Sequence, residues 1–208
     1  MSHKEHIVEQ AMQMFVAQGI KSVRMDDIAQ HLRVSKRTLY ELFGDKEELL
    51  YQAMSAYLEQ ARCRREELAR GAADIIQAMF VVLQDVMNFS SQTNRMLANL
   101  RKFYPAVSER LQVEGSERGR NDLRKMLYEG IKQGFFIDSF NVDLSISVLY
   151  YSSAAIISDQ KTMLPEGLSA RRAFVQIIST FFRGVATEKG MRLIDLYRER
   201  YMQEQNEY

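Results

Sequence analysis

This sequence has few of the residues that crosslink, interrupt or anchor a chain. Its 208 residues include one cysteine, Cys63, two prolines and no tryptophan. One cysteine cannot form an intramolecular disulfide, and a chain of this length can bury a core without disulfides or metals. The opening MSHKEHIVEQ is not an apolar signal segment, and no apolar run approaches the roughly 20 residues of a membrane helix. We therefore expect a soluble, cytoplasmic protein without a membrane partner.

An excess of charge of one sign is also lacking. The chain has 28 lysines and arginines against 27 aspartates and glutamates, so any affinity for an anionic partner must be local. Motifs of hydrolytic and nucleotide-binding enzymes (HExxH, GxSxG, the P-loop) and CxxC are absent, and His3, His6 and His31 fit surface positions better than ligand positions. We predict no catalytic residue, no metal site and no cofactor, and we do not expect an enzyme.

What the sequence does contain is long stretches of helical periodicity, which predict an all-α protein. The first four helices are expected at about His3–Gln18, at Met25–Leu32, from the cap Ser35 to about Leu42, and from the cap Asp45 to about Arg70. Later helices are expected at about 72–90, 93–103, 106–114, 118–133, 143–158, 169–185 and 188–205, with breaks at glycine- and proline-containing segments.

The second and third expected helices are short and joined by a tight turn. With Leu39 placed inside, Phe43 lies within about 60° of it on the helical wheel, whereas Arg37 and Glu41 point about 160° away. This pattern is typical of a helix-turn-helix, in which the second helix enters the major groove of DNA. Thr38 would lie at the side of this helix, where a hydroxyl reaches a phosphate.

Three cations stand at the start of the third helix: Arg33, Lys36 and Arg37. They form a local anion site, and an arginine there can pair bidentately with a guanine edge, which discriminates by about 1–3 kcal/mol. The alternative is a solvated helix face, on which Arg37 and Glu41, four residues apart, form an exposed ion pair worth a few tenths of a kcal/mol.

The segment from Phe15 to Leu50, FVAQGIKSVRMDDIAQHLRVSKRTLYELFGDKEELL, closely resembles the DNA-binding domain of tetracycline-repressor (TetR) family regulators. The resemblance is carried by Phe15, Gly19, DIA at 27–29, VS at 34–35, TLY at 38–40, Phe43 and DKEEL at 45–49. It implies an N-terminal three-helix DNA-binding domain with a helix-turn-helix, here residues 1–48. It also implies a C-terminal helical domain for effector binding and dimerisation, here residues 49–208.

The resemblance also implies which residues touch DNA. By position they are Ser35, Lys36, Arg37, Thr38 and Tyr40, with Lys46 holding a phosphate; Glu41, Arg24 and Arg33 complete our predicted set. The chain departs from the family pattern in having Arg24 at a common Ser or Thr position, and Arg33 and Arg37 at common glycine positions. A left-handed Arg33 would cost about 1 kcal/mol or more.

Two apolar segments near the C-terminus, DLSISVLYYSSAAII and AFVQIISTFFRGV, have too much apolar surface for a monomer. The resemblance implies that these helices form a four-helix dimer interface; the alternative is intramolecular core. A dimer would hold two recognition helices about 34–36 Å apart, which predicts a pseudo-palindromic operator. The predicted interface residues are Leu149, Ile156, Phe174, Ile177, Ile178, Phe181 and Phe182.

An effector pocket is implied by the same resemblance. Its predicted lining is Phe80, Met87, Phe103, Tyr104, Tyr128 and Tyr150, although each could instead be ordinary core. The scarcity of buried charge suggests a largely apolar small molecule. The sequence thus predicts a homodimeric repressor that such an effector releases from a double-stranded DNA operator. The alternative is a helical dimeric ligand-binding or interaction module without specific DNA binding.

Overall fold

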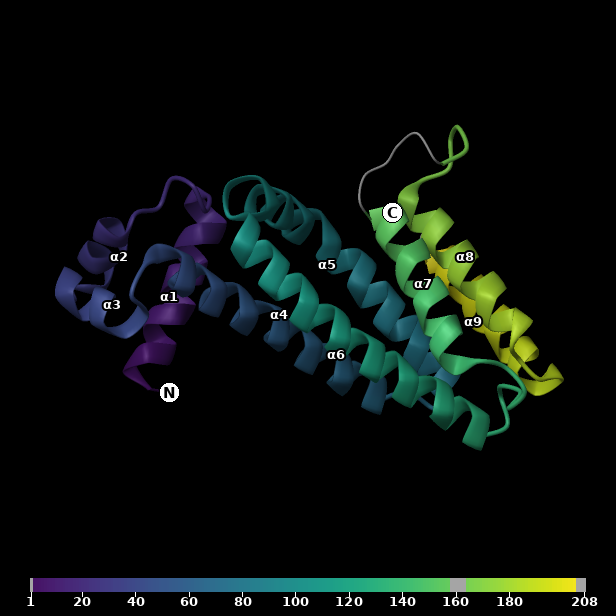
Figure 1. Ribbon diagram of the computed structural model, residues 1–208. Coiled ribbons are helices and arrows are strands. Elements are labelled where there is room, and N and C mark those ends of the chain that lie inside the picture. Colours follow the sequence, from purple (N-terminus) through teal and green to yellow (C-terminus); the bar gives the residue numbers. More distant parts are fainter. Residues whose placement is uncertain (1, 158–163, 205–208) are drawn as a thin grey trace. The chain divides into compact units, whose positions relative to one another are not determined.

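The computed structural model describes residues 2–157 and 164–204, apart from the side chains of 88–92, 94, 154–157, 170 and 202–204. In these ranges the chain is helical with one isolated antiparallel bridge, between Phe136 and Ala186, which confirms the predicted all-α class (Figure 1). The helices are α1 His3–Gln18, α2 Met25–Leu32, α3 Lys36–Phe43, α4 Lys46–Arg70, α5 Ile75–Phe103, α6 Pro105–Lys132, α7 Val142–Ile157, α8 Ala170–Gly184 and α9 Glu188–Glu204. None of those described is both long and apolar enough to cross a membrane.

Local signals set the ends of the N-terminal helices. Ser2 and Glu5 form a capping box at the start of α1, and Gly19 ends that helix at φ 88°. Asp45 caps α4, because its Oδ1 accepts from the backbone N–H of Glu48 at 2.8 Å. The predicted bounds of α1 and α2 are therefore confirmed, and that of α3 differs by one residue.

The long helices α5 and α6 contradict the sequence-based prediction. Breaks were expected near residues 90–93 and in EGSERG, but α5 and α6 continue through these positions. Serine, threonine and asparagine oppose a helix only weakly, and each glycine costs about 1 kcal/mol, which packing readily outweighs. At Gly119 the missing side chain also makes room for Tyr150, whose hydroxyl would lie 3.3 Å from an added Cβ.

By compactness the chain divides into two units. Unit 1 comprises Met1–Arg64 and Ser90–Ser116, and unit 2 comprises Arg65–Phe89 and Glu117–Tyr208. The helices α4, α5 and α6 each contribute residues to both units. Compactness does not measure function, so the functional boundary at residue 48 stays a prediction.

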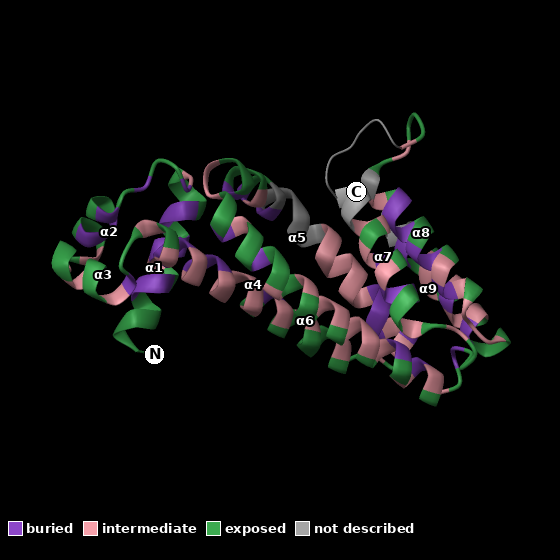
Figure 2. Ribbon diagram, in the orientation of Figure 1, coloured by how far each residue is buried: buried purple, intermediate pink, exposed green. Residues whose placement is uncertain are grey.

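The core of unit 1 joins the three N-terminal helices to later parts of the chain. Phe15, Ile28 and Leu39, one from each of α1, α2 and α3, are buried in the same cluster. Figure 2 shows buried segments in each of these three helices. Leu100 of α5 and Val107 of α6 belong to it as well. The end of α5 and the start of α6 therefore form part of the platform that carries the helix-turn-helix.

Unit 2 has its own apolar core, formed mainly by α7, α8 and α9 with parts of α5 and α6. Phe174 and Ile178 of α8 and Ile194 of α9 are among its buried residues. At Gly190 an added Cβ would lie 2.0 Å from the carbonyl oxygen of Phe135. Only glycine permits this close approach of α9 to the loop after α6, so the packing of unit 2 depends on it.

Candidate nucleic-acid interface

The turn between α2 and α3 is held by backbone hydrogen bonds. Arg33 adopts φ 55° and ψ 37°, the left-handed conformation, and its N–H donates to the carbonyl of Gln30 at 3.3 Å. The N–H of Val34 donates to Ala29 at 3.0 Å, which closes the end of α2. The left-handed backbone of Arg33 is therefore strained by about 1–2 kcal/mol, as expected for a residue with a side chain.

Hydroxyl groups fix the start of α3. The Oγ of Ser35 accepts from the N–H of Thr38 at 3.0 Å, which confirms Ser35 as the cap, and lies 2.8 Å from the Oγ1 of Thr38. At the start of α2, the backbone N–H of Arg24 donates to the carboxylate of Asp27 at 2.8 Å, and Arg24 is exposed. Both helices are thus locally ordered without using the side chain of Arg24.

The faces of α3 follow the predicted pattern. Leu39 is fully buried and Phe43 is 3% exposed, so these two side chains attach the helix to unit 1. Away from this buried face, the side chain of Arg37 is 87% exposed, and Tyr40, at the flank of the helix, is 49% exposed. An exposed guanidinium and a half-exposed aromatic ring are therefore accessible to a partner.

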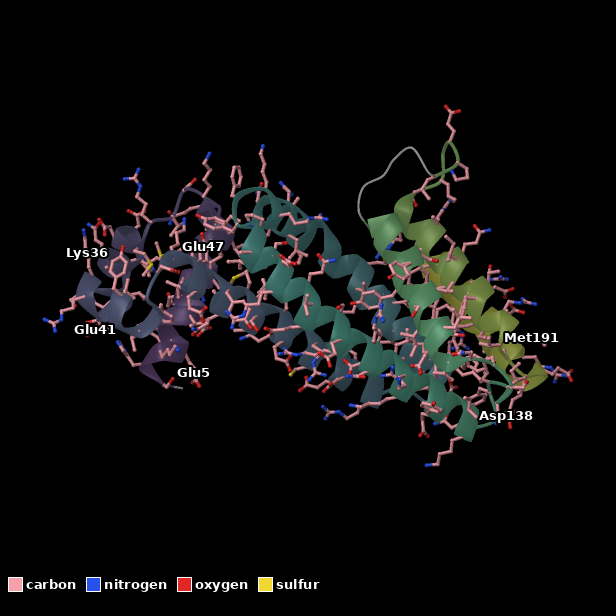
Figure 3. The ribbon with its side chains drawn as sticks, in the orientation of Figure 1. Glu5, Lys36, Glu41, Glu47, Asp138 and Met191 are labelled. Carbon is pink, nitrogen blue, oxygen red and sulfur yellow. The ribbon has the colours of Figure 1, made fainter. Side chains whose placement is uncertain are left out.

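Two exposed ion pairs neutralise the cations of α3. The Nε of Arg37 donates to the carboxylate of Glu41 at 2.7 Å, and Lys36 pairs with Asp26 of α2. Figure 3 shows Lys36 and Glu41 projecting outward from α3. Exposed pairs contribute about 0–1 kcal/mol, so phosphates can replace these carboxylates at little cost. The Arg37 pair uses only Nε, which leaves both Nη groups for a base edge.

Lys46, the first residue of α4, has a defined position in the free protein. Its Nζ donates to the carbonyl of Ile20 at 2.7 Å and lies 5.3 Å from the centre of the Tyr104 ring. An ammonium group has three donors, so two remain for a phosphate. All the predicted DNA contacts lie between residues 24 and 46 of unit 1; their contact with DNA stays a prediction.

The family comparison agrees with this geometry. Residues 7–53 match the family described as bacterial regulatory proteins, tetR family, and this span contains the whole helix-turn-helix. This match supports membership of the TetR family. Together with the relatives described below, it supports a DNA-binding transcriptional regulator.

Relatives of this chain also match outside the helix-turn-helix. The transcriptional repressor KstR2 of Mycolicibacterium smegmatis is 20% identical over 149 residues, which cover 72% of this chain and 73% of the relative. The regulator YezE of Bacillus subtilis is 23% identical over 82 residues, which cover 39% and 42%. A solved TetR-family regulator from Marinobacter aquaeolei shares the fold, with a TM-score of 0.60, 17% identity and coverage of 97% and 99%.

The six predicted pocket residues fall in different surroundings. Phe80 and Met87 belong to the apolar core of unit 2, whereas Tyr128 is 56% exposed. Tyr150 is half-buried, and this burial raises the pKa of its phenol above the ordinary value. Phe103 and Tyr104 belong to unit 1 and lie beside lysines of that unit. The effector pocket stays a prediction.

The predicted dimer residues also differ in exposure. Ile177 is 40% exposed and Phe181 is half-buried, while the side chain of Ile156 lies outside the described residues. Four others are buried in the core of unit 2, which favours the intramolecular interpretation for them: Leu149, Phe174, Ile178 and Phe182.

Sequence reasoning missed an exposed apolar stripe on α7. Leu144, Val148 and Tyr151 are 62%, 46% and 71% exposed, and their spacing of four and three residues places them on one face. We call these three residues the α7 stripe. The same spacing is visible in DLSISVLYY, but periodicity cannot tell which apolar face of a two-sided helix its own chain covers.

Proposed function

We propose that this TetR-family regulator is a homodimeric repressor that binds a pseudo-palindromic operator and is released by a small, largely apolar effector. The observation that carries DNA recognition is the division of α3 into a buried face, Leu39 and Phe43, and an exposed polar face. We call Lys36, Arg37, Tyr40 and Glu41 the recognition face. Repression is supported by the relative KstR2, which is named a transcriptional repressor.

In the proposed complex, α3 enters the major groove. The free Nη groups of Arg37 pair with O6 and N7 of a guanine. The hydroxyls of Tyr40 and Thr38 donate to phosphates at the sides of the groove, and Lys46 binds a further phosphate. DNA phosphates take over Lys36 from Asp26, an exchange that costs little because the pair is exposed.

Dimerisation through α7 and α8 is supported by the α7 stripe. These apolar side chains lie in water on unit 2, and Ile177 of the adjacent α8 is also exposed. A second copy related by a two-fold axis would cover them with the same surface. Such a dimer presents two copies of α3 one DNA turn apart, about 34–36 Å, and hence calls for a pseudo-palindrome.

Effector binding in unit 2 is supported by the chemistry of its core. The cluster contains Phe80 and is packed by Met87, whose flexible thioether adapts to apolar ligands. Ser179 and Tyr201 have buried hydroxyls without a hydrogen-bond partner among the described residues. Leaving a buried polar group unpaired costs about 1–3 kcal/mol, so an apolar effector with one polar group could satisfy either hydroxyl.

The test is selection of bound duplexes from a random DNA pool by the full chain, repeated with Arg37→Ala. We expect wild type to enrich a pseudo-palindrome, and the variant to bind it about 10- to 100-fold more weakly with one base position relaxed in each half-site. The control is Arg192→Ala, because Arg192 also forms an exposed pair four residues from its partner, Glu188, but on α9.

Unselective binding by wild type would contradict sequence-specific regulation and favour the alternative, a dimeric ligand-binding or interaction module. In that case Arg37→Ala and Tyr40→Ala should leave self-association and ligand binding unchanged. Sedimentation velocity and thermal shift with candidate ligands measure these two properties without DNA, so the two functions can be told apart.

A further inference from the structure

The corner between α5 and α6 carries two adjacent aromatic rings on the surface of unit 1. Phe103 is the last residue of α5, Tyr104 follows, and Pro105 begins α6, where its fixed φ and missing N–H are well suited. The N–H of Tyr104 donates to Leu100 at 2.8 Å, and Leu100 is fully buried in the core of unit 1. The corner is therefore anchored to the core of unit 1, to which the helix-turn-helix also belongs.

The ring of Phe103 contacts one lysine from a distant part of the chain and one from the adjacent position in α5. The Nζ of Lys21, in the loop between α1 and α2, lies 4.7 Å from the ring centre, and that of Lys102 lies 5.4 Å from it. Figure 1 shows the α1–α2 loop beside this corner. Each cation–π contact is worth about 0.5–1 kcal/mol at an exposed site, which is enough to bias where the ammonium group rests.

The ring of Tyr104 holds a third lysine. Lys46 lies over this ring and donates to the carbonyl of Ile20, the residue before Lys21. The three ammonium groups therefore adjoin the same corner, and we call Lys21, Lys46 and Lys102 the lysine cluster.

Within the described part of the chain, no member of the lysine cluster pairs with a carboxylate, although Lys36 and Arg37 on nearby α3 both do. Three cations without a counter-charge raise the local positive potential and attract an anion. The C-terminal end of the α5 dipole further favours a cation at Lys102. One member of the cluster, Lys46, is only three residues beyond the end of α3.

We propose that Lys21 and Lys102 of the lysine cluster make a second contact to the DNA backbone, outside the helix-turn-helix and beside the phosphate assigned to Lys46. Lys21 and Lys102 bind phosphates that flank the one held by Lys46, and Tyr104 positions Lys46 for that contact. The partner is duplex DNA, because several adjoining cations fit a regular row of phosphates and Lys46 lies at the edge of the DNA-binding element. This inference deepens the proposed function and rests on it for the choice of DNA.

The salt dependence of binding measures the phosphates directly. On B-DNA, the slope of log affinity against log salt is about −0.9 per phosphate neutralised. The full-length chain is titrated with a labelled random-sequence duplex at several salt concentrations. For Lys21→Gln combined with Lys102→Gln, we expect a slope less steep by about 1.8 for each bound protomer. The loss should be the same on a selected operator, since phosphate contacts do not depend on base sequence.

The matched control is Lys132→Gln. Lys132 is an exposed lysine in the last turn of α6, as Lys102 is in the last turn of α5, but it belongs to unit 2. If the slope of log affinity against log salt changes in the double variant by no more than twice its change in Lys132→Gln, the proposal is overturned. Such a result would show only a general effect of net charge.

Tyr104 is a positioning residue, and its own test separates that role from a structural one. Tyr104→Phe keeps the ring and should keep the wild-type slope, whereas Tyr104→Leu should reduce the slope by up to about 0.9. If Tyr104→Leu lowers the melting temperature and leaves the slope unchanged, the ring only stabilises the fold and the positioning role is overturned.

The failure of this proposal differs visibly from the failure of the proposed function. If no operator is selected, sequence-specific regulation fails, but the slope on random-sequence DNA still decides whether the lysine cluster binds phosphate. If Arg37→Ala relaxes a selected operator while the lysine variants keep the wild-type slope, the proposed function stands and the second contact is overturned.

Discussion

The helices α3 and α7 are both amphipathic, and they leave opposite kinds of surface in water. On α3 the exposed residues are the recognition face, which is charged and aromatic; on α7 they are the apolar α7 stripe. Their buried faces are alike, with Leu39 on α3 and Ile146 and Leu149 on α7. The buried face attaches a helix to its unit, so the exposed face indicates what the helix is for.

The two exposed faces differ because the two proposed partners differ in charge and hydration. DNA keeps its backbone hydrated and charged, so a helix that meets it needs donors and cations. A second protein copy offers apolar surface, and burying apolar area contributes about 25 cal/mol per Å². The entrances to the two helices are alike, because Ser35 before α3 and Asn141 before α7 each accept a backbone N–H three residues on. The left-handed residue lies earlier: Arg33, which ends α2, is the one non-glycine residue with positive φ in the described ranges.

The largest expected effect comes from giving α7 a charged exposed face. The double change Leu144→Glu and Val148→Glu should convert the dimer to a monomer, because like charges would face each other across the two-fold axis. Operator affinity should fall by about 100-fold or more, since linking two binding heads is worth that much. Sedimentation velocity and operator titration measure the two effects.

Val113→Glu is the control for this change, because Val113 is an exposed apolar residue of α6, in unit 1. We expect it to leave self-association unchanged. If the α7 double variant also remains a dimer, the dimer uses another surface and the contrast between α3 and α7 loses its functional meaning.

The next effect separates the two faces of α3 with neighbouring residues. Tyr40→Ala removes a half-exposed side chain and should weaken operator binding by about 1.5–3 kcal/mol, the value of a hydrogen bond to a charged group. The free energy of unfolding should change by less than about 0.5 kcal/mol. Leu39→Ala should instead lower the free energy of unfolding by about 2–5 kcal/mol. Urea denaturation and operator titration of both variants check this, and a large loss of stability in Tyr40→Ala would refute the assignment of faces.

The smallest expected effect concerns Arg33, in the turn between α2 and α3. Arg33→Gly should raise the free energy of unfolding by about 1 kcal/mol, because glycine adopts the left-handed conformation without strain. Arg33→Ala keeps most of the strain and removes the same charge, so it serves as the matched variant in urea denaturation. Equal stabilities of the two variants would mean that the left-handed turn stores no strain.

The local features of unit 1 were predictable because short-range chemistry determines them. Ser35 and Asp45 cap helices through groups three residues away, and Gly19 ends α1 through its own backbone freedom. The predicted breaks in α5 and α6 were wrong for the opposite reason. Polar residues and glycines in the middle of a helix carry small local costs, and packing against distant residues decides whether the helix continues.

By itself the sequence determined the all-α class, the capped helices of the helix-turn-helix and the division of α3 into an inner and an outer face. All three follow from interactions within a few residues of the chain. Only the tertiary structure decided that Phe174 and Leu149 are covered while the α7 stripe is exposed. The tertiary structure also brought Lys21 into contact with Phe103, which is far from it in the sequence. Periodicity shows that a face is apolar or charged, but contacts between residues far apart in the chain decide what covers it.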